Sequence, residues 1–207
     1  MTELAPTAAE VAAAWDEVHQ HPDRTHRQSL IHPTGANPED YALVGLAQAE
    51  VLAALAQGYA TREVLDVLDF GCGDGRVLAM LPDSWDTYGC DTSQAAVTQA
   101  EARSPAAAVF TIEPGERLGT QYDLVYCLAV LIHLTVADGV LAVQQMAEAV
   151  RPGGLLVIDV PLAEEARSGG SWISVTCWDR PLLGTAAEAS GCQLAAVEAP
   201  WHVLRKL

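Results

Sequence analysis

The stretch Val67-Leu-Asp-Phe-Gly-Cys-Gly-Asp-Gly-Arg-Val-Leu78 decides the fold of this 207-residue chain. It predicts a buried strand, a turn with glycine at every second position, and a helix that begins at about Gly75. Because glycine has no β-carbon, a ligand can approach the main-chain N–H groups of such a turn closely. A helix that begins there would add its unpaired N–H groups and the positive end of its dipole. The stretch therefore predicts a binding site for a small molecule.

The spacing of the glycines separates two kinds of cofactor site. The dinucleotide fingerprint G-x-G-x-x-G, counted from Gly71, requires a glycine where this chain has Arg76, and this disfavours a nicotinamide-dependent oxidoreductase. The pattern D-x-G-x-G-x-G from Asp69 to Gly75 instead resembles the first motif of class I S-adenosylmethionine (SAM) dependent methyltransferases. Taken alone, the motif also fits a tight strand-to-helix turn that binds no ligand.

Length and composition indicate one globular domain with its own core. The net charge of -16 and the scattered basic residues disfavour nucleic acid as a partner. The longest apolar run, residues 124–134, is shorter than the roughly 20 residues of a membrane-spanning helix, and the first residues lack the features of a signal peptide. Five cysteines without C-x-x-C spacing indicate reduced core thiols. We expect a cytoplasmic protein that binds neither nucleic acid nor membrane.

Strand and helix patterns alternate along the chain. Apolar segments at 63–70, 87–91, 107–112 and 155–159 predict strands, and residues 122–134 predict a further strand that runs into a loop. Helices are predicted at 76–81, 94–103 and 135–150 between them. A further helix at 181–190 and strands at 192–198 and 202–207 follow. This order predicts an α/β fold, a Rossmann-like doubly wound sheet of about seven strands, mostly parallel, with helices on both faces.

The N-terminal region has a different character. Residues 7–19 have helical spacing, and His19, His21, His26 and His32 follow within fourteen positions. No carboxylate or thiol lies at a spacing that would complete a zinc site, so we expect no metal there. Histidines in a polar loop are commonly solvated, and a role for one of these at the mouth of the substrate site is favoured over a metal site. We expect residues 1–38 to form a helical lid segment and residues 39–207 the main domain, whose first helix begins at Asn37-Pro38.

The resemblance to class I methyltransferases covers about residues 40–207. Tyr122-Asp123 is similar to the family's (F/Y)-D-x-V strand, and Arg151-Pro-Gly-Gly154 is similar to the turn before its fifth strand. The resemblance implies an antiparallel last strand and a bound SAM, with S-adenosylhomocysteine (SAH) as the product. In a doubly wound sheet the ligand lies beyond the carboxyl ends of the strands where the strand order reverses. Here that point is between the first and fourth strands.

Several residues are expected to hold this cofactor. Asp91 ends the second strand, where a carboxylate can accept hydrogen bonds from both ribose hydroxyls, although an ordinary turn or capping aspartate is the alternative. The resemblance implies an acidic residue for the adenine amino group, for which we choose Glu113 over Glu116. Tyr41 is either a cofactor contact or a core aromatic residue. The expected cofactor-binding residues are Asp69, Gly71, Cys72, Gly73, Gly75, Asp91, Thr92, Glu113, Leu128 and Tyr41.

Methyl transfer mainly requires that the nucleophile and the methyl group be held in line, with water excluded. Where the acceptor carries a proton, a base assists, and His133 is the first candidate and His32 the second. The alternative for His133 is a hydrogen-bonded histidine at a strand end. We therefore expect a SAM-dependent methyltransferase, a monomer or homodimer, acting on an oxygen or nitrogen nucleophile of a small molecule. The competing interpretation is a binding or regulatory module of the same fold without methyl transfer.

Overall fold

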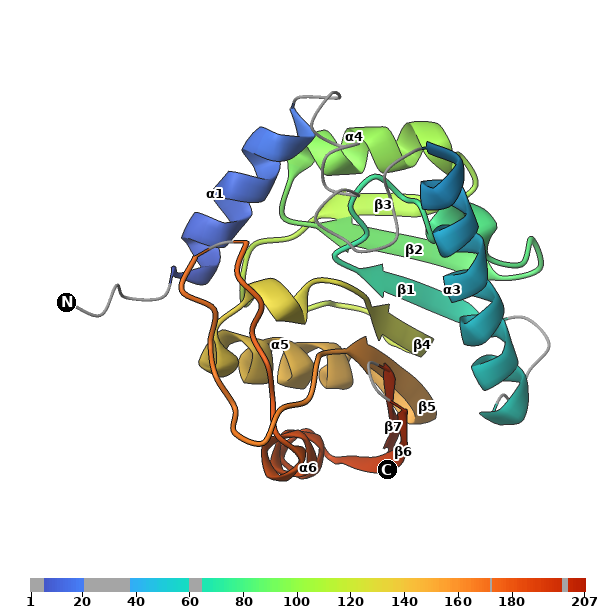
Figure 1. Ribbon diagram of the computed structural model, residues 1–207. Helices are drawn as coiled ribbons and strands as arrows, with labels where there is room; N and C mark the ends of the chain where they lie inside the picture. Colours follow the sequence, from blue (N-terminus) through green and yellow to red (C-terminus); the bar gives the residue numbers. More distant parts are fainter. Residues whose placement is uncertain (1–5, 21–37, 60–64, 172, 199–200) are drawn as a thin grey trace. The chain divides into compact units, whose positions relative to one another are not determined.

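The structure is a computed structural model that describes residues 6–20, 38–59, 65–171, 173–198 and 201–207 (Figure 1). The chain forms two compact units. The first, called here the N-terminal unit, is Ala13–Ile112, and the second, the C-terminal unit, combines Met1–Ala12 with Glu113–Leu207. Val67 and Leu68 are fully buried in the first unit, and Leu156 and Trp178 are fully buried in the second. Each unit therefore has apolar core residues of its own.

The N-terminal unit contains three parallel strands. Its elements are α1 (Ala8–His19, whose first residues belong to the other unit), α3 (Pro38–Tyr59), β1 (Asp66–Phe70), the 3-10 helix η1 (Leu78–Met80), β2 (Asp86–Asp91), α4 (Gln94–Arg103) and β3 (Ala108–Thr111). β2 pairs with β1 on one side and β3 on the other, and α4 packs against β2 and β3. The Ser93 hydroxyl accepts a hydrogen bond from the Ala96 N–H at 3.0 Å, a side-chain cap that starts α4 at the predicted residue.

The helix expected at residues 76–81, beginning at about Gly75, does not form. The structure has turns there and then the three-residue η1. Gly75 has a φ of +77°, outside the right-handed helical region, and Pro82 disfavours a helical conformation of the residue before it. Too few residues remain between these two positions for an α-helix. The expected contribution of a helix dipole at the glycine turn is therefore wrong.

The C-terminal unit contains the other four strands. After the part of α1 that belongs to it, the elements are β4 (Tyr122–Cys127), the 3-10 helix η2 (Leu131–His133), α5 (Val136–Glu148), β5 (Val150–Asp159), α6 (Arg180–Ala189), β6 (Cys192–Glu198) and β7 (Trp201–Lys206). β4 is parallel to β5, whereas β7 is antiparallel to both β5 and β6. α5 packs against β5 and α6 against β6. The expected antiparallel last strand is confirmed.

The strand order of the seven-stranded sheet is β3-β2-β1-β4-β5-β7-β6. Strands β1, β2 and β3 belong to the N-terminal unit. Strands β4, β5, β6 and β7 belong to the C-terminal unit. Helices flank the sheet. The pairs β1–β2, β2–β3 and β4–β5 are parallel. The predicted Rossmann-like fold of about seven strands is therefore confirmed.

The Arg-Pro-Gly-Gly segment lies within β5 rather than ahead of it. Tyr122 of β4 pairs with Val150, but Leu124 pairs with Leu155, so residues 151–154 bulge out of the ladder. Insertion of extra residues into one strand of a pair has this consequence. The prediction of a turn followed by a strand placed the strand start too late, because the main chain remains extended on both sides of the bulge.

The two motif segments of this region meet in the structure. The Arg151 Nη1 atom lies 2.8 Å from the Asp123 Oδ2 atom. This ion pair joins the start of β4 to the bulge of β5. The role of these two motif residues in the structure is therefore to hold neighbouring strands together.

One helix of the described residues is long and apolar enough to cross a membrane by length and composition. It is α3, over Glu39–Tyr59, with a mean hydropathy of 1.2 in its most apolar window. Helices that pack on soluble proteins pass the same test, and one face of α3 is buried through Ala49, Leu52 and Ala56. The test is therefore weak evidence for a span.

Candidate functional site

The glycine turn between β1 and η1 has the conformation that its sequence requires. Gly71, Gly73 and Gly75 all have positive φ values, of +80°, +53° and +77°. Residues with a β-carbon rarely adopt this region, so glycine is needed at each position. A β-carbon on Gly75 would also lie 2.9 Å from the Ala100 Cα atom of α4, whereas one on Gly73 would meet no atom closer than 3.8 Å. Gly75 therefore serves packing, and Gly73 leaves open space.

The N–H groups of the turn are largely used within the protein. Gly71 and Cys72 both donate to the Cys90 carbonyl, at 2.8 and 2.9 Å, and Gly75 donates to the Cys72 carbonyl at 3.0 Å. The Gly73 N–H donates to a carboxylate oxygen of Asp91. The expected cradle of free N–H donors is therefore wrong for these four groups. What the glycines provide is a main-chain surface without side chains.

Asp91 at the end of β2 is turned toward the glycine turn. Its Oδ2 atom accepts from the Gly73 N–H at 2.9 Å, and its Oδ1 atom accepts from the Ser93 N–H at 2.9 Å. A carboxylate oxygen has more than one acceptor position, so each oxygen can still accept from a ligand hydroxyl. The structure thus brings the acid and the turn together, as the ribose hypothesis requires. Thr92, the next residue, is exposed, and the cap of α4 comes from Ser93.

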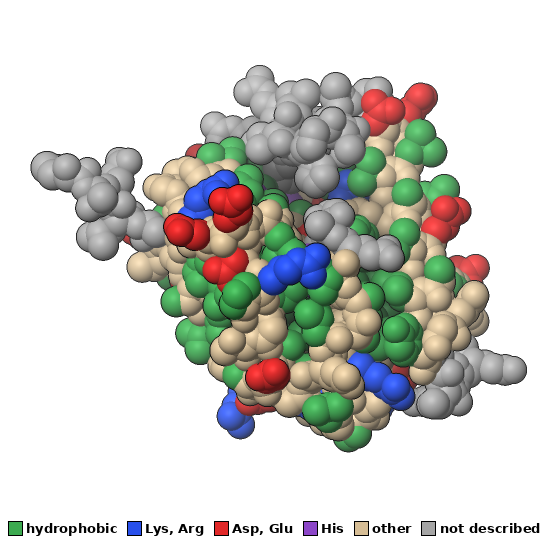
Figure 2. All heavy atoms as spheres, turned by 60° about the horizontal axis from the view of Figure 1, so that its bottom comes forward, with side chains coloured by type: hydrophobic (Ala, Val, Ile, Leu, Met, Phe, Trp, Pro, Cys, Tyr) green, Lys and Arg blue, Asp and Glu red, His purple; other side chains and the backbone are tan. Residues whose placement is uncertain are grey.

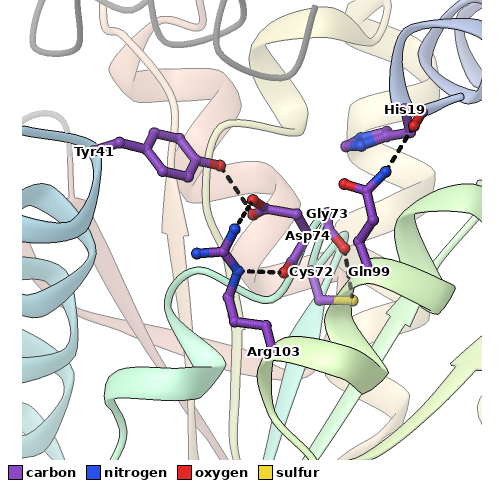
Figure 3. A network of polar contacts seen from close by, with 7 residues as sticks. All are labelled: His19, Tyr41, Cys72, Gly73, Asp74, Gln99 and Arg103. Carbon is purple, nitrogen blue, oxygen red and sulfur yellow. Dashed lines mark hydrogen bonds and ion pairs between the residues drawn. The ribbon is translucent and has the colours of Figure 1, made fainter. Parts of the chain in front are cut away.

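A buried carboxylate in the turn, Asp74, was missed by the sequence reasoning. Its side chain is 3% exposed and lies 2.6 Å from the Arg103 Nη2 atom, while the Arg103 Nε atom donates to the Asp74 carbonyl at 3.0 Å (Figure 3). The Tyr41 hydroxyl donates to Asp74 Oδ1 at 2.9 Å. Asp74 therefore ties the turn to α4 and α3. No local signal marks this role, because both partners are far away in the sequence.

Tyr41 is held by this network. Burial raises the pKa of its hydroxyl, and the Arg76 guanidinium lies over its ring, 4.5 Å from the centroid. The same guanidinium donates to the Gln48 Oε1 atom at 3.0 Å. A cation over an aromatic face is a favourable contact. The hydroxyl of Tyr41 is thus committed to Asp74, and what remains for a ligand is the ring.

Asp69 and Cys72 lie at the two ends of the bend from β1 into the turn. Both are buried, Asp69 at 4% and Cys72 at 7% exposure. Burial, followed by the negative charges of Asp69 and Asp91, raises the pKa of the Cys72 thiol. A thiol is nucleophilic as the thiolate. Burial and these two charges therefore disfavour the thiolate form of Cys72.

The segment after β4 has an unusual main-chain conformation. Ala129 has a φ of +59°, and it is the non-glycine residue with positive φ among those described. Its N–H donates to the Asp159 Oδ1 atom at 2.7 Å, from the end of β5. Strain of this kind persists where the surroundings hold it, and it concentrates at functional sites. Leu128, the expected cofactor contact, directly precedes Ala129 and is buried. An alanine gives no sequence signal for such a conformation.

His133, the candidate base, ends η2 and is half-buried. Thr176 holds this segment from the loop that follows β5, called here the 160–178 loop. The Thr176 N–H donates to the Ile132 carbonyl at 2.7 Å, and its hydroxyl donates to the Leu134 carbonyl at 2.6 Å. The main chain on both sides of His133 is therefore held in place.

The remaining candidates are the two acidic residues proposed for the adenine contact and the histidines of the N-terminal region. Glu113 and Glu116 are both exposed, and the Glu113 N–H donates to the Glu116 carboxylate at 2.9 Å. The choice between them for the adenine contact stays a prediction. His32, His21 and His26 lie outside the described residues. Within the described part of the chain, no group of three His, Cys, Asp or Glu side chains is placed to hold a metal ion.

Comparison with known families and structures gives the broader assignment. A family model described as a methyltransferase domain matches residues 68–156. No curated protein sequence matches the chain. The matched range begins within β1 and ends within β5, so it contains the glycine turn and Asp91.

Similar solved structures share the fold. One is the SAM-bound magnesium protoporphyrin IX methyltransferase ChlM from Synechocystis PCC 6803, with a TM-score of 0.72 at 18% identity over 98% of this chain and 100% of that chain. A second is SAM-bound CalS10, an amino pentose methyltransferase from Micromonospora echinaspora, with 0.66 at 22% identity over 79% and 92%. A third is the sugar N-methyltransferase KedS8 from Streptoalloteichus sp ATCC 53650, with 0.65 at 20% identity over 78% and 87%. The match to the methyltransferase-domain model over residues 68–156 and the fold shared with these structures make the chain similar to SAM-dependent methyltransferases.

Proposed function

We propose that this enzyme transfers the methyl group of SAM to an oxygen or nitrogen nucleophile of a small-molecule acceptor and releases SAH. The observation that carries the proposal is that Asp91 lies against the glycine turn, where its carboxylate accepts a hydrogen bond from the Gly73 N–H at 2.9 Å. This arrangement fits an adenosyl cofactor, because a ribose has two neighbouring hydroxyls from which a carboxylate can accept hydrogen bonds. The burial of Asp69 and Cys72 beside this turn supports the same assignment, and Leu128 is proposed as a further cofactor contact.

In this proposal the chain's residues mainly bind and orient. When bound, SAM would supply a methyl group on a positively charged sulfur. The lone pair of the acceptor would form the new bond to the methyl carbon as the C–S bond breaks, and the sulfur would leave as the neutral thioether of SAH. Asp91 holds the ribose, and Gly73 leaves room for the ligand. Gly71 and Gly75 give the turn its main-chain conformation, and Tyr41, Thr92 and Glu113 are proposed as outer contacts. His133 accepts the proton that the acceptor loses, with His32 as second candidate. Alignment of the reacting atoms roughly 3 Å apart supplies most of the acceleration.

Two observations support a small-molecule acceptor. The similar structures are named for an amino pentose, a sugar nitrogen and a porphyrin, all small molecules. The chain has a net charge of -16, and Figure 2 shows the Lys and Arg side chains of the described residues apart from one another on the face drawn. A polyanion is bound through clustered positive charge. We therefore propose a cytoplasmic enzyme, monomer or homodimer, that acts on a small molecule and not on nucleic acid or at a membrane, with residues 39–207 as its catalytic domain.

Calorimetry tests the cofactor. We expect SAM and SAH to bind and NAD not to bind, and binding of NAD alone would contradict the proposal. Turnover is then measured as SAH release against a panel of amino sugars, phenols, carboxylic acids and porphyrins. SAM binding without turnover on any of these acceptors would favour the regulatory module of the same fold instead.

A further inference from the structure

Helix α1 ends with a buried imidazole that has an unused nitrogen. His19 is 6% exposed, and its Nδ1 atom is buried without a hydrogen-bond partner among the described residues. A buried polar atom left without a partner costs free energy. The proposed function gives this residue no role, so the cost of burying its Nδ1 atom without a partner is not yet explained.

Two long-range contacts hold the end of α1 in place. The Asp16 Oδ1 atom accepts a hydrogen bond from the Ser93 hydroxyl at 2.6 Å, and this bond lowers the pKa of Asp16. The His19 carbonyl accepts from the Gln99 Nε2 atom at 2.6 Å. Ser93 and Gln99 are the cap and a middle residue of α4. The orientation of the His19 ring is thus supported by two anchors on a rigid element of the same unit.

The ring is directed at the glycine turn. Figure 3 shows the imidazole of His19 reaching from α1 over Gly73. A β-carbon on Gly73 would have the His19 Cε1 atom as its nearest neighbour, at 3.8 Å, and Cε1 is the ring carbon between the two nitrogens. The ring carbon that lies between the two nitrogens is therefore the part of His19 nearest to the space that Gly73 leaves.

The electrostatic surroundings restrict what can face this nitrogen. Asp91, Asp74 and Asp16 all interact with the imidazole, and burial nevertheless lowers the pKa of His19. A neutral imidazole has one N–H donor and one acceptor nitrogen. A ligand carboxylate would be repelled by the acidic neighbours, whereas a hydroxyl is uncharged and can both donate and accept. A hydroxyl beside Asp91 is therefore the group that fits.

We propose that His19 is a further cofactor-binding residue, whose imidazole hydrogen-bonds a ribose hydroxyl of the adenosyl ligand held by Asp91. This inference rests on the proposed function, because it requires an adenosyl cofactor at the glycine turn. In this proposal α1 contributes to cofactor binding. The ligand hydroxyl provides the hydrogen bond that the Nδ1 atom of His19, the last residue of α1, lacks.

The test uses two ligands and three variants of the full chain. SAH contains the ribose and the amino-acid part, whereas 5′-methylthioadenosine contains the ribose alone. His19→Phe keeps a ring without nitrogens, His19→Ala removes the ring and is the substitute if the phenyl ring does not fit, and His19→Asn places an amide near the position of Nδ1. Thermal melting of each variant without ligand confirms that it folds.

We expect His19→Phe and His19→Ala to raise the dissociation constants of both ligands by about tenfold, the effect of one hydrogen bond. His19→Asn should retain most of the affinity. A merely structural histidine would not give this rescue together with equal losses for the two ligands. Unchanged dissociation constants in folded Phe and Ala variants would overturn the proposal, and a loss confined to SAH would overturn the assignment to the ribose. Failure of the wild-type chain to bind either ligand would instead contradict the proposed function.

Discussion

The glycine turn and the 160–178 loop follow strands β1 and β5, but they are held in different ways. The turn is held by its own residue types: three glycines with positive φ, and N–H groups that donate to Cys72, Cys90 and Asp91. The loop is held by contacts with distant segments, including the bonds from Thr176 to both sides of His133. The comparison teaches that a cofactor turn can be encoded by a short motif, whereas a segment near a candidate base is shaped by tertiary contacts.

The two regions also differ in exposure. Asp69, Cys72 and Asp74 of the first region are buried. Glu164, Glu165 and Arg167 of the loop are exposed and line a surface hollow. Buried polar groups need partners and so specify one arrangement, whereas exposed charges are satisfied by water. We expect substitutions near the turn to alter binding and stability, and substitutions beside the loop to alter turnover.

The largest expected effect separates turnover from binding. If His133 is the base, His133→Ala should lower kcat by about 10²–10⁴-fold, while the dissociation constant of SAM stays unchanged because a base acts on the acceptor and not on the cofactor. Thr176→Val is the control, since it removes the hydroxyl bond to the Leu134 carbonyl without touching the imidazole. Undiminished turnover in His133→Ala, or an equal loss in Thr176→Val, would leave His133 with a structural role.

The second prediction concerns the stability of the turn. Gly75→Ala places a β-carbon at a φ of +77° and 2.9 Å from the Ala100 Cα atom, so it should destabilise the fold by about 2–5 kcal/mol through strain and overpacking. Gly115→Ala is the matched control, because Gly115 has a φ of +81° with nothing within 4 Å. We expect the control to cost about 1–2 kcal/mol, from strain alone. Denaturant unfolding measures both, and equal losses would show that the contact with Ala100 relaxes freely.

The third prediction concerns the ribose carboxylate. Asp91→Ala should weaken SAM binding by about 1.5–3 kcal/mol, the range for a hydrogen bond to a charged group. Asp86→Ala is the control, since Asp86 is an exposed acid at the start of the same strand. Titration calorimetry on both variants makes the comparison. An unchanged dissociation constant of SAM in Asp91→Ala would show that Asp91 only holds the turn through its bonds to the Gly73 and Ser93 N–H groups.

The smallest effect is a pH dependence in the C-terminal unit. Burial lowers the pKa of His202, whose Nε2 atom lies 2.8 Å from the Val160 carbonyl where the 160–178 loop begins. A carbonyl only accepts, so Nε2 carries the hydrogen of a neutral ring. Below about pH 6.5 the unfolded chain binds a proton that the folded chain does not, and stability should therefore fall as the pH is lowered.

His202→Gln keeps an amide N–H near the Val160 carbonyl but does not titrate. We expect its melting temperature to fall less than that of the wild type between pH 7.5 and pH 5.5. Part of the dependence should remain, because burial lowers the pKa of His19 as well. Identical slopes for variant and wild type would show that His202 does not contribute to this pH dependence.

Local patterns predicted most of the fold. The helix Gln94–Arg103 was expected at its observed bounds, since Ser93 gives a capping signal that needs no distant residue. The expected helix at 76–81 was wrong because the apolar spacing there competes with the positive φ of Gly75 and with Pro82. The bulge at residues 151–154 was missed because register is a property of two strands.

The sequence by itself determined the order of strands and helices and the positions that must be glycine, because hydrophobic period and main-chain sterics act between neighbouring residues. Tertiary structure decided that the turn's N–H groups are used within the protein, that Asp74 pairs with Arg103, and that His19 lies over Gly73. Such contacts join residues far apart in the chain, and no local preference specifies them. The motif therefore predicts where a ligand binds, and packing selects the side chains that surround it.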